Sequence, residues 1–242
     1  MSAGSWPTPH LIRSICPMPD LRLVICDVDG TLVDSQAEIV AAMASAFASQ
    51  DMPMLDRATV LSIVGLSLDE AFAQLCPHVD PTTRGYLVQA YKDAFNDLRG
   101  SGAKAELSPM FAGAREALLA LHAQDEILLA VATGKSKRGL DKMIEKHGLE
   151  GIFVSQQVAD FHPSKPHPAM VLAALSETGV APHRAVMLGD TTFDMDMGRA
   201  GGVGTIGVSW GYHPVETLTA DIIIDDFNSL PEAVNLLTGH KT

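Results

Sequence analysis

The stretch LRLVICDVDGTLVDS, residues 21–35, joins a nearly continuous apolar run to an acidic turn. The apolar part, residues 21–26, is typical of a strand that is buried on both faces of a parallel sheet. Asp27 and Asp29 follow it directly, and Gly30 allows the backbone to turn sharply. Because side chains two apart in extended backbone point the same way, we expect both carboxylates at one edge of a sheet.

Apolar runs of this kind recur along the chain and alternate with helical patterns. The runs are ILLAVA at 127–132, AVML at 185–188, TIGV at 205–208 and III at 222–224. Between them, apolar residues recur at helical spacing, as with Leu140 and Ile144 ahead of a favoured helix end at Gly148. This alternation predicts an α/β fold with a Rossmann-like parallel sheet that carries helices on both faces.

One long segment, residues 35–106, shows helical patterns and no strand. Apolar side chains recur every four residues at two places in it: Ile39, Met43 and Phe47, then Leu87, Tyr91 and Phe95. We predict an all-helical cap domain at 35–106, inserted into an α/β core that is formed by residues 21–34 and 107–242. Residues 1–20 contain four prolines and are expected to form a flexible N-terminal extension.

Composition excludes several classes of protein. The chain has 242 residues, with 17 Lys plus Arg against 29 Asp plus Glu, and its formal net charge is −12. A chain this acidic is a poor binder of nucleic acid, and no window approaches the length of an apolar membrane span. The three cysteines, Cys16, Cys26 and Cys76, form no CxxC pair and are typical of reduced thiols. We therefore expect a cytoplasmic protein without nucleic-acid or membrane partners.

Polar residues follow several of the predicted strands, where a parallel α/β sheet binds its ligands. They are Asp27 and Asp29 after the first run, Thr133 and Gly134 after 127–132, and Asp190 and Asp194 after 185–188. Lys165 lies in a proline-rich loop ahead of the helix that leads to the run at 185–188. A metal ion and a phosphoryl group together explain this set of carboxylates, hydroxyl and lysine.

These residues stand in four short motifs, which are DVDGTLVDS at 27–35, ATGKS at 132–136, SKPHP at 164–168 and GDTTFD at 189–194. In their order and spacing they resemble the haloacid dehalogenase (HAD) superfamily, in its phosphatase branch, and most of all its phosphoglycolate phosphatases. The resemblance runs from about residue 21 to the C-terminus and includes a helical cap after the first motif. It implies a Mg²⁺-dependent phosphatase that hydrolyses a small phosphorylated metabolite, as a monomer or homodimer.

The resemblance also implies roles for the first two aspartates. Asp27 is expected to attack phosphorus and form an aspartyl-phosphate intermediate. The Asp29 carboxylate is expected to protonate the leaving oxygen and then to deprotonate the hydrolytic water. In the family, the main-chain carbonyl of the residue at Asp29 is a metal ligand, beside the carboxylates of Asp27 and Asp190.

The remaining motif residues are expected to bind the phosphoryl group or to support those that do. Thr133 and the Gly134 amide would hydrogen-bond the phosphoryl oxygens, and Lys165 would neutralise charge that develops during transfer. Asp194 is expected to act behind the metal ligands, through water or by orienting Lys165. Lys135 lies next to this site in the sequence; it could assist the site, but we expect it at the surface.

Three other functions share part of this pattern. A phosphomutase of the β-phosphoglucomutase type uses the same residues and differs mainly in its cap. A 2-haloacid dehalogenase does not need Asp29, and a non-catalytic binding module does not need the whole set. The cap segment VGLSL, residues 64–68, contains no Arg or Lys, so it does not demand a second anionic group on the substrate. Phosphoglycolate itself therefore stays an open choice.

Overall fold

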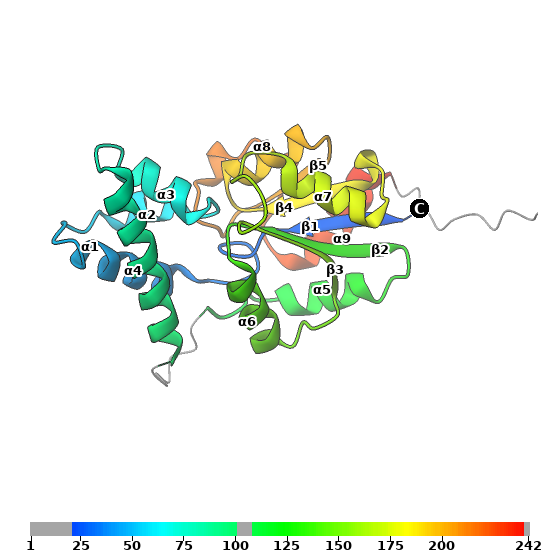
Figure 1. Cartoon of the computed structure of the whole chain (residues 1–242). Coiled ribbons are helices and arrows are strands. Elements are labelled where there is room, and N and C mark those ends of the chain that lie inside the picture. The colour runs from blue at the N-terminus through cyan, green and yellow to red at the C-terminus, as the bar shows by residue number, and fades with distance from the viewer. Residues whose placement is uncertain (1–20, 101–107, 240–242) are drawn as a thin grey trace, which may run out of the picture.

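The computed structural model describes residues 21–100 and 108–239, so the extension expected at residues 1–20 lies outside the described part. Six parallel strands form one sheet in the order β3-β2-β1-β4-β5-β6 (Figure 1). The strands are β1 (Arg22–Cys26), β2 (Ile127–Thr133), β3 (Phe153–Val158), β4 (Ala185–Gly189), β5 (Gly204–Val208) and β6 (Ile222–Ile224). The predicted α/β fold with a parallel sheet is confirmed.

Helices cover both faces of the sheet (Figure 1). Those on one face are α5 (Ala114–His122), α6 (Lys137–His147) and α9 (Leu230–Thr238), and those on the other are α7 (Ala169–Thr178) and α8 (Thr192–Ala200). In β1, Val24 and Cys26 join the first of these two cores, and Leu23 and Ile25 join the second. Side chains that alternate between two buried faces explain why β1 is apolar at consecutive positions.

The apolar runs do not predict one strand, β3, which reads FVSQQV. Its side chains at Ser155 and Gln157 are polar yet buried, and Nε2 of Gln157 donates a hydrogen bond of 2.8 Å to Oγ of Ser155. β3 lies at the edge of the sheet and pairs only with β2 within the described residues. A buried polar pair of this kind removes the apolar signature on which strand prediction depends.

Four helices are inserted between β1 and β2 and lie to one side of the sheet (Figure 1). They are α1 (Gln36–Ala48), α2 (Arg57–Leu61), α3 (Leu68–Leu75) and α4 (Pro81–Gly100), and we call residues 36–100 the cap. The predicted helical insertion is thereby confirmed. The cap has a hydrophobic core of its own, in which the rings of Phe47 and Tyr91 lie 6.2 and 6.4 Å from the ring of Phe72.

The cap touches the α/β core through the loop that joins α2 to α3. The backbone N–H of Ser67 donates a hydrogen bond of 2.8 Å to Oγ of Ser164, in the loop between β3 and α7. Nε2 of His213, in the segment after β5, lies 3.0 Å from the carbonyl oxygen of Ser62. These contacts hold the cap over the carboxyl ends of the strands.

Two further features bear on the expectations from composition. Among the helices of residues 21–100 and 108–239, none combines the length and apolar character that a bilayer crossing requires. Cys26 and Cys76 are buried free thiols, and Cys16 lies outside the described residues.

The cap core leads to a stability prediction. Phe72 is fully buried between two aromatic rings, so Phe72→Ala is expected to lower the free energy of unfolding by about 3–5 kcal/mol. Tyr86→Ala on α4 is the control, because Tyr86 is 59 % exposed and its loss leaves no cavity. Denaturation in urea measures both variants, and equal losses of stability would contradict this description of the cap.

Candidate active site

The site begins at the centre of the sheet, where three strands end side by side. β1 lies between β2 and β4, and Cys26 at its end is aligned with Val131 and Leu188. The residues that follow these strands therefore meet at one edge. Asp27 comes directly after β1 and Asp190 directly after β4, while Thr133 is the last residue of β2.

Three carboxylates form a buried cluster at this edge. Asp27, Asp190 and Asp194 each offer an oxygen, and these oxygens all lie within 4.8 Å of one another. None of the three residues is more than 1 % exposed. Oδ1 of Asp190 accepts a hydrogen bond of 2.8 Å from the Thr31 hydroxyl, and Oδ2 accepts one of 2.9 Å from the Tyr212 backbone N–H. We call these three residues the acidic trio.

Glycines make room for Asp190 on two sides. Gly30 has φ +85°, in the left-handed region, and a side-chain carbon there would overlap the Asp190 carboxylate. A side-chain carbon at Gly211 would overlap the same side chain from the opposite segment. Asp190 is therefore packed between two backbone segments that accept only glycine.

Lys165 lies against the trio from the loop between β3 and α7. Its Nζ is 2.7 Å from Oδ1 of Asp27 and 2.7 Å from Oδ1 of Asp194. The residue is only 1 % exposed, and burial by itself lowers the pKa of the ammonium group. The carboxylates of Asp194 and Asp27 outweigh burial and raise that pKa above its usual value, so Lys165 stays charged.

Asp194 is fixed by the start of α8. Its Oδ2 accepts hydrogen bonds from the backbone N–H of Thr191 at 3.1 Å and from the Thr191 hydroxyl at 2.7 Å. The Thr191 side chain in turn accepts from the Asp194 N–H, which completes a capping box. Oδ1 of Asp194 contacts Lys165, and Oδ2 takes part in the capping box. Asp194 therefore holds the lysine and does not face the cleft.

The charges of this cluster do not cancel. Three carboxylates against one ammonium leave a formal charge of −2 in a buried volume. Burial raises the pKa of Asp27 to about 7, against the lowering effect of Lys165, and Asp194 and Asp29 raise it further. Burial and the charges of Asp27 and Asp194 likewise raise the pKa of Asp190 well above its usual range.

A divalent cation fits this set of groups. The donors are carboxylate oxygens, which suit a hard ion such as Mg²⁺, and its charge of +2 would balance the cluster. Oδ2 of Asp27 is buried and has no hydrogen-bond partner among residues 21–100 and 108–239, so it is free to bind an ion. The acidic trio is thus a candidate metal centre.

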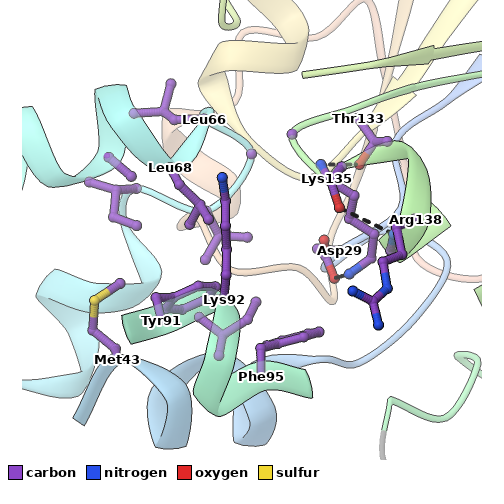
Figure 2. A pocket seen from close by; sticks show the side chains of 18 of the residues that line it. Asp29, Met43, Leu66, Leu68, Tyr91, Lys92, Phe95, Thr133, Lys135 and Arg138 are labelled. Atoms are coloured by element: carbon purple, nitrogen blue, oxygen red, sulfur yellow. Dashed lines mark hydrogen bonds and ion pairs between the residues drawn. The ribbon is translucent and has the colours of Figure 1, made fainter. Parts of the chain in front are cut away.

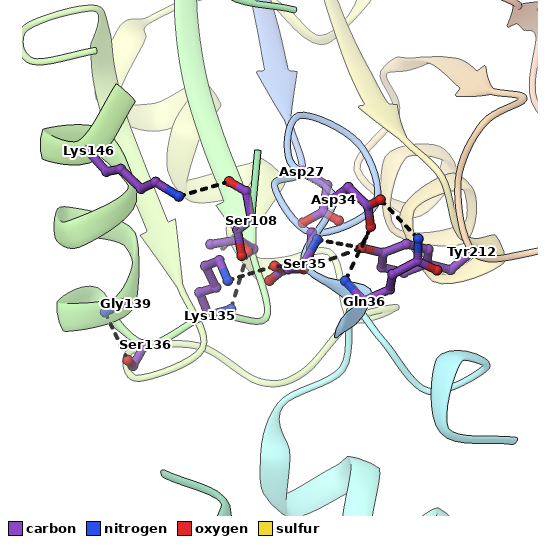
Figure 3. Close-up of polar contacts among 12 residues, drawn as sticks. Asp27, Asp34, Ser35, Gln36, Ser108, Lys135, Ser136, Gly139, Lys146 and Tyr212 are labelled. Atoms are coloured by element: carbon purple, nitrogen blue, oxygen red, sulfur yellow. Dashed lines mark hydrogen bonds and ion pairs between the residues drawn. The ribbon is translucent and has the colours of Figure 1, made fainter. Parts of the chain in front are cut away.

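The Asp29 carboxylate has other partners than the trio. Its Oδ1 accepts a hydrogen bond from the Ser35 hydroxyl and lies 2.6 Å from Nζ of Lys135 (Figure 2). Ser35 is itself held by Tyr212, whose hydroxyl accepts a hydrogen bond of 2.9 Å from the Ser35 backbone N–H (Figure 3). The geometry leaves the Asp29 side chain beside the cleft and outside the metal cluster.

The expectation that Lys135 lies at the surface is wrong. Its side chain is only 7 % exposed, and besides Asp29 it meets the cap, with Nζ 5.5 Å from the centre of the Phe95 ring. Phe95 is on α4, about forty residues earlier in the chain. Sequence reasoning missed this contact because it forms between the cap and the core, and no local sequence pattern around Lys135 indicates it.

A cavity of about 410 Å³ lies between the cap and the strand ends (Figure 2). Asp27, Asp29, Thr133 and Gly134 line its inner end, whereas Asp190, Asp194 and Lys165 are buried behind it. Gly134 forms a tight contact with the cap, since a side-chain carbon there would lie 2.6 Å from the carbonyl oxygens of residues 65 and 66. Four of the predicted site residues thus line the inner end of the cavity, and the other three lie directly behind it.

The segment after β5 supports the site. Trp210 is a packing residue, because its ring centre lies 4.8 Å from that of Phe227 and 6.0 Å from that of Phe111. Tyr212 contacts Asp190 through its backbone and Ser35 through its hydroxyl.

Comparison with known proteins is consistent with these features. The sequence matches the family described as haloacid dehalogenase-like hydrolase over residues 24–208. It is 36 % identical over 221 residues to the protein named Probable phosphatase IndB of Dickeya dadantii, a match that covers 89 % of this chain and 94 % of the relative. It is 33 % identical over 221 residues to the phosphoglycolate phosphatase of Caulobacter vibrioides, covering 88 % and 91 %.

Solved structures share the fold. A hydrolase from Pseudomonas syringae superposes with a TM-score of 0.77 at 21 % identity, over 89 % of this chain and 99 % of that one. At 21 % identity this similarity supports a shared fold and nothing further.

The uncompensated charge predicts how stability depends on pH. In EDTA, the protein is expected to lose stability as the pH rises from about 4 to about 7, because Asp27 ionises near 3.8 when unfolded and near 7 when folded. Added Mg²⁺ should restore the melting temperature at pH 7.

Asp190→Asn provides the matched comparison. Without metal at pH 7, this variant should melt above the wild-type protein, because one buried like charge is gone. Mg²⁺ should then raise the melting temperature of this variant only slightly. Equal stabilisation of both proteins by Mg²⁺ in differential scanning calorimetry would show that the ion binds elsewhere.

Proposed function

The chain belongs to the haloacid dehalogenase-like hydrolases, and we propose that it is a Mg²⁺-dependent phosphatase that hydrolyses a small phosphomonoester in the cleft under its cap. One observation carries this proposal: Asp27 and Asp29 line the same cavity, while Lys165, Asp190 and Asp194 lie directly behind Asp27. The family match and the phosphatase names of the relatives support it.

The metal would be held at the acidic trio. Its ligands would be the carboxylates of Asp27 and Asp190 and the main-chain carbonyl of Asp29, the set that the family resemblance implies, with Asp194 behind them. When bound, Mg²⁺ supplies positive charge to the phosphoryl oxygens, which otherwise face a cluster of carboxylates.

Asp27 is proposed as the nucleophile. One of its oxygens is held by Lys165 at 2.7 Å, which fixes the carboxylate and favours its ionised form. That carboxylate would form a bond to phosphorus as the bond from phosphorus to the alcohol oxygen breaks, giving an aspartyl-phosphate and a free alcohol. Water then cleaves this intermediate, so that one slow hydrolysis becomes two faster steps.

Asp29 is proposed as the acid and base. In the first step its carboxyl group would give a proton to the departing oxygen, and the ammonium of Lys135 would stabilise the carboxylate that remains. In the second step that carboxylate would take a proton from the attacking water. The hydroxyl of Ser35 keeps the Asp29 side chain oriented toward the cleft through both steps.

Thr133, Gly134 and Lys165 are proposed to bind the phosphoryl group. The side chain of Thr133 accepts a hydrogen bond of 3.2 Å from the Lys135 N–H, which orients its hydroxyl at the end of β2. The cap loop packed on Gly134 would keep bulk water out during phosphoryl transfer. The presence of Asp29 beside the cleft favours phosphoryl transfer over the 2-haloacid dehalogenase reaction, which does not need this residue.

The nucleophile is tested by Asp27→Asn. The variant is expected to lose at least about 10³-fold in kcat, because an amide does not form the acyl-phosphate. Phosphate release with Mg²⁺ over a panel of phosphorylated metabolites measures it. Asp196→Asn is the control, since Asp196 is an exposed carboxylate on the same protein, paired with Arg199 on α8. Full activity in folded Asp27→Asn protein would rule out the mechanism.

The acid and base role is tested by Asp29→Asn with two leaving groups. Alkyl phosphates need protonation of their leaving oxygen, so their turnover should fall by about 10²- to 10⁴-fold. With p-nitrophenyl phosphate the first step needs no acid, so rapid-quench kinetics should show a burst of one equivalent of nitrophenol before slow turnover. A uniform loss on both esters without a burst would count against this role. Accumulation of a sugar bisphosphate with little free phosphate in the wild-type protein would indicate a phosphomutase instead.

A further inference from the structure

The cavity has two chemically different walls (Figure 2). The core contributes polar groups and glycines to its lining: the two aspartates of the first motif, residues 133–136, and the exposed side of α6. All of the larger apolar side chains in the lining come from the cap. The larger apolar side chains of the lining thus belong to the cap, and the two aspartates of the first motif belong to the core.

The cap wall is formed by side chains from three helices and a loop. Met43 comes from α1, Leu66 from the loop before α3, Leu68 from the start of α3, and Phe95 from α4. In Figure 2 these side chains lie across the cavity from Asp29 and Thr133. α4 also contributes polar side chains to the lining, among them Gln89, Lys92 and Asn96. The surface that faces the catalytic carboxylates is thus mainly hydrocarbon.

The size of the cavity adds a second constraint. A volume of about 410 Å³ falls within the range of roughly 300–1,000 Å³ that is usual for pockets that bury a drug-sized ligand. A two-carbon hydroxy acid would fill a small part of it and would leave the apolar side chains of the cap without a contact. A sugar would place some of its hydroxyl groups against Met43, Leu66 and Leu68, whose side chains offer no hydrogen-bond partner.

We propose that the leaving alcohol has an apolar body of several carbon atoms, which packs on the cap wall formed by Met43, Leu66, Leu68 and Phe95. This inference rests on the phosphatase function proposed above and specifies its substrate class. An alkyl or aryl chain would exclude water from the wall and gain the free energy of apolar burial, while its phosphate reaches Asp27. The phosphoryl group is common to all substrates, so the wall is the part that discriminates among them.

The test compares three phosphate esters of primary alcohols. n-Hexyl phosphate and glucose 6-phosphate have similar size and differ in polarity, and phosphoglycolate is small and carries a carboxylate. We expect kcat/KM to be at least about tenfold higher for n-hexyl phosphate than for either of the others. A preference for phosphoglycolate or glucose 6-phosphate would overturn this inference and leave the phosphatase intact. No phosphate release from any ester would overturn both proposals.

A matched pair of variants on α3 tests the wall itself. Leu68 and Leu75 both lie on this helix, and both are partly buried against the cap core, but only Leu68 lines the cavity. Leu68→Ala should lower kcat/KM for n-hexyl phosphate by about tenfold and change that for phosphoglycolate by less than about twofold. Leu75→Ala should leave the ratio of the two unchanged. Equal losses of kcat/KM for all esters in Leu68→Ala would show that Leu68 serves only the stability of the cap, and would overturn the proposal.

Discussion

The structure depends on the way in which several carboxylates are held together out of water. Asp27, Asp190 and Asp194 repel one another, and a buried charge of this kind is tolerated only where it is paired or hydrogen-bonded. Lys165 joins two of the three, Thr31 and the Tyr212 backbone satisfy Asp190, and the capping box of α8 holds Asp194. What remains is a deficit of two positive charges, which a divalent cation would balance, and the proposed function depends on that cation to attract a phosphoryl group.

The proposed function requires a chain with a net charge of −12 to bind an anion, and this arrangement explains how that is compatible. The field at the site is set by groups within a few ångströms, whereas exposed charges beyond about 8–10 Å are screened by salt. The parallel sheet provides the required closeness, because β1 is central and its neighbours end at the same level. Burial of the trio and of Lys165 keeps them away from bulk water, which would weaken each of these interactions.

Much of the fold and the membership of the site could be predicted from the sequence, for identifiable reasons. Asp27 and Asp190 follow apolar runs, and parallel strands carry such residues to one edge, so their proximity follows from local patterns. β3 escaped prediction because its buried positions are occupied by a hydrogen-bonded Ser155 and Gln157. Lys135 and the apolar wall also escaped, since each is created by the docking of one part of the chain on another. The catalytic roles themselves stay predictions.

The position of the cap in the chain has a consequence for biosynthesis. β1 and Asp27 leave the ribosome early, but β1 pairs with β2 and β4, which begin at Ile127 and Ala185, more than a hundred residues later. Helices of the cap make local contacts that form quickly, whereas the central strand must wait for distant partners. The central strand and Asp27 are therefore synthesised long before their partners, and the acidic trio is complete only when Asp190 and Asp194 have been added.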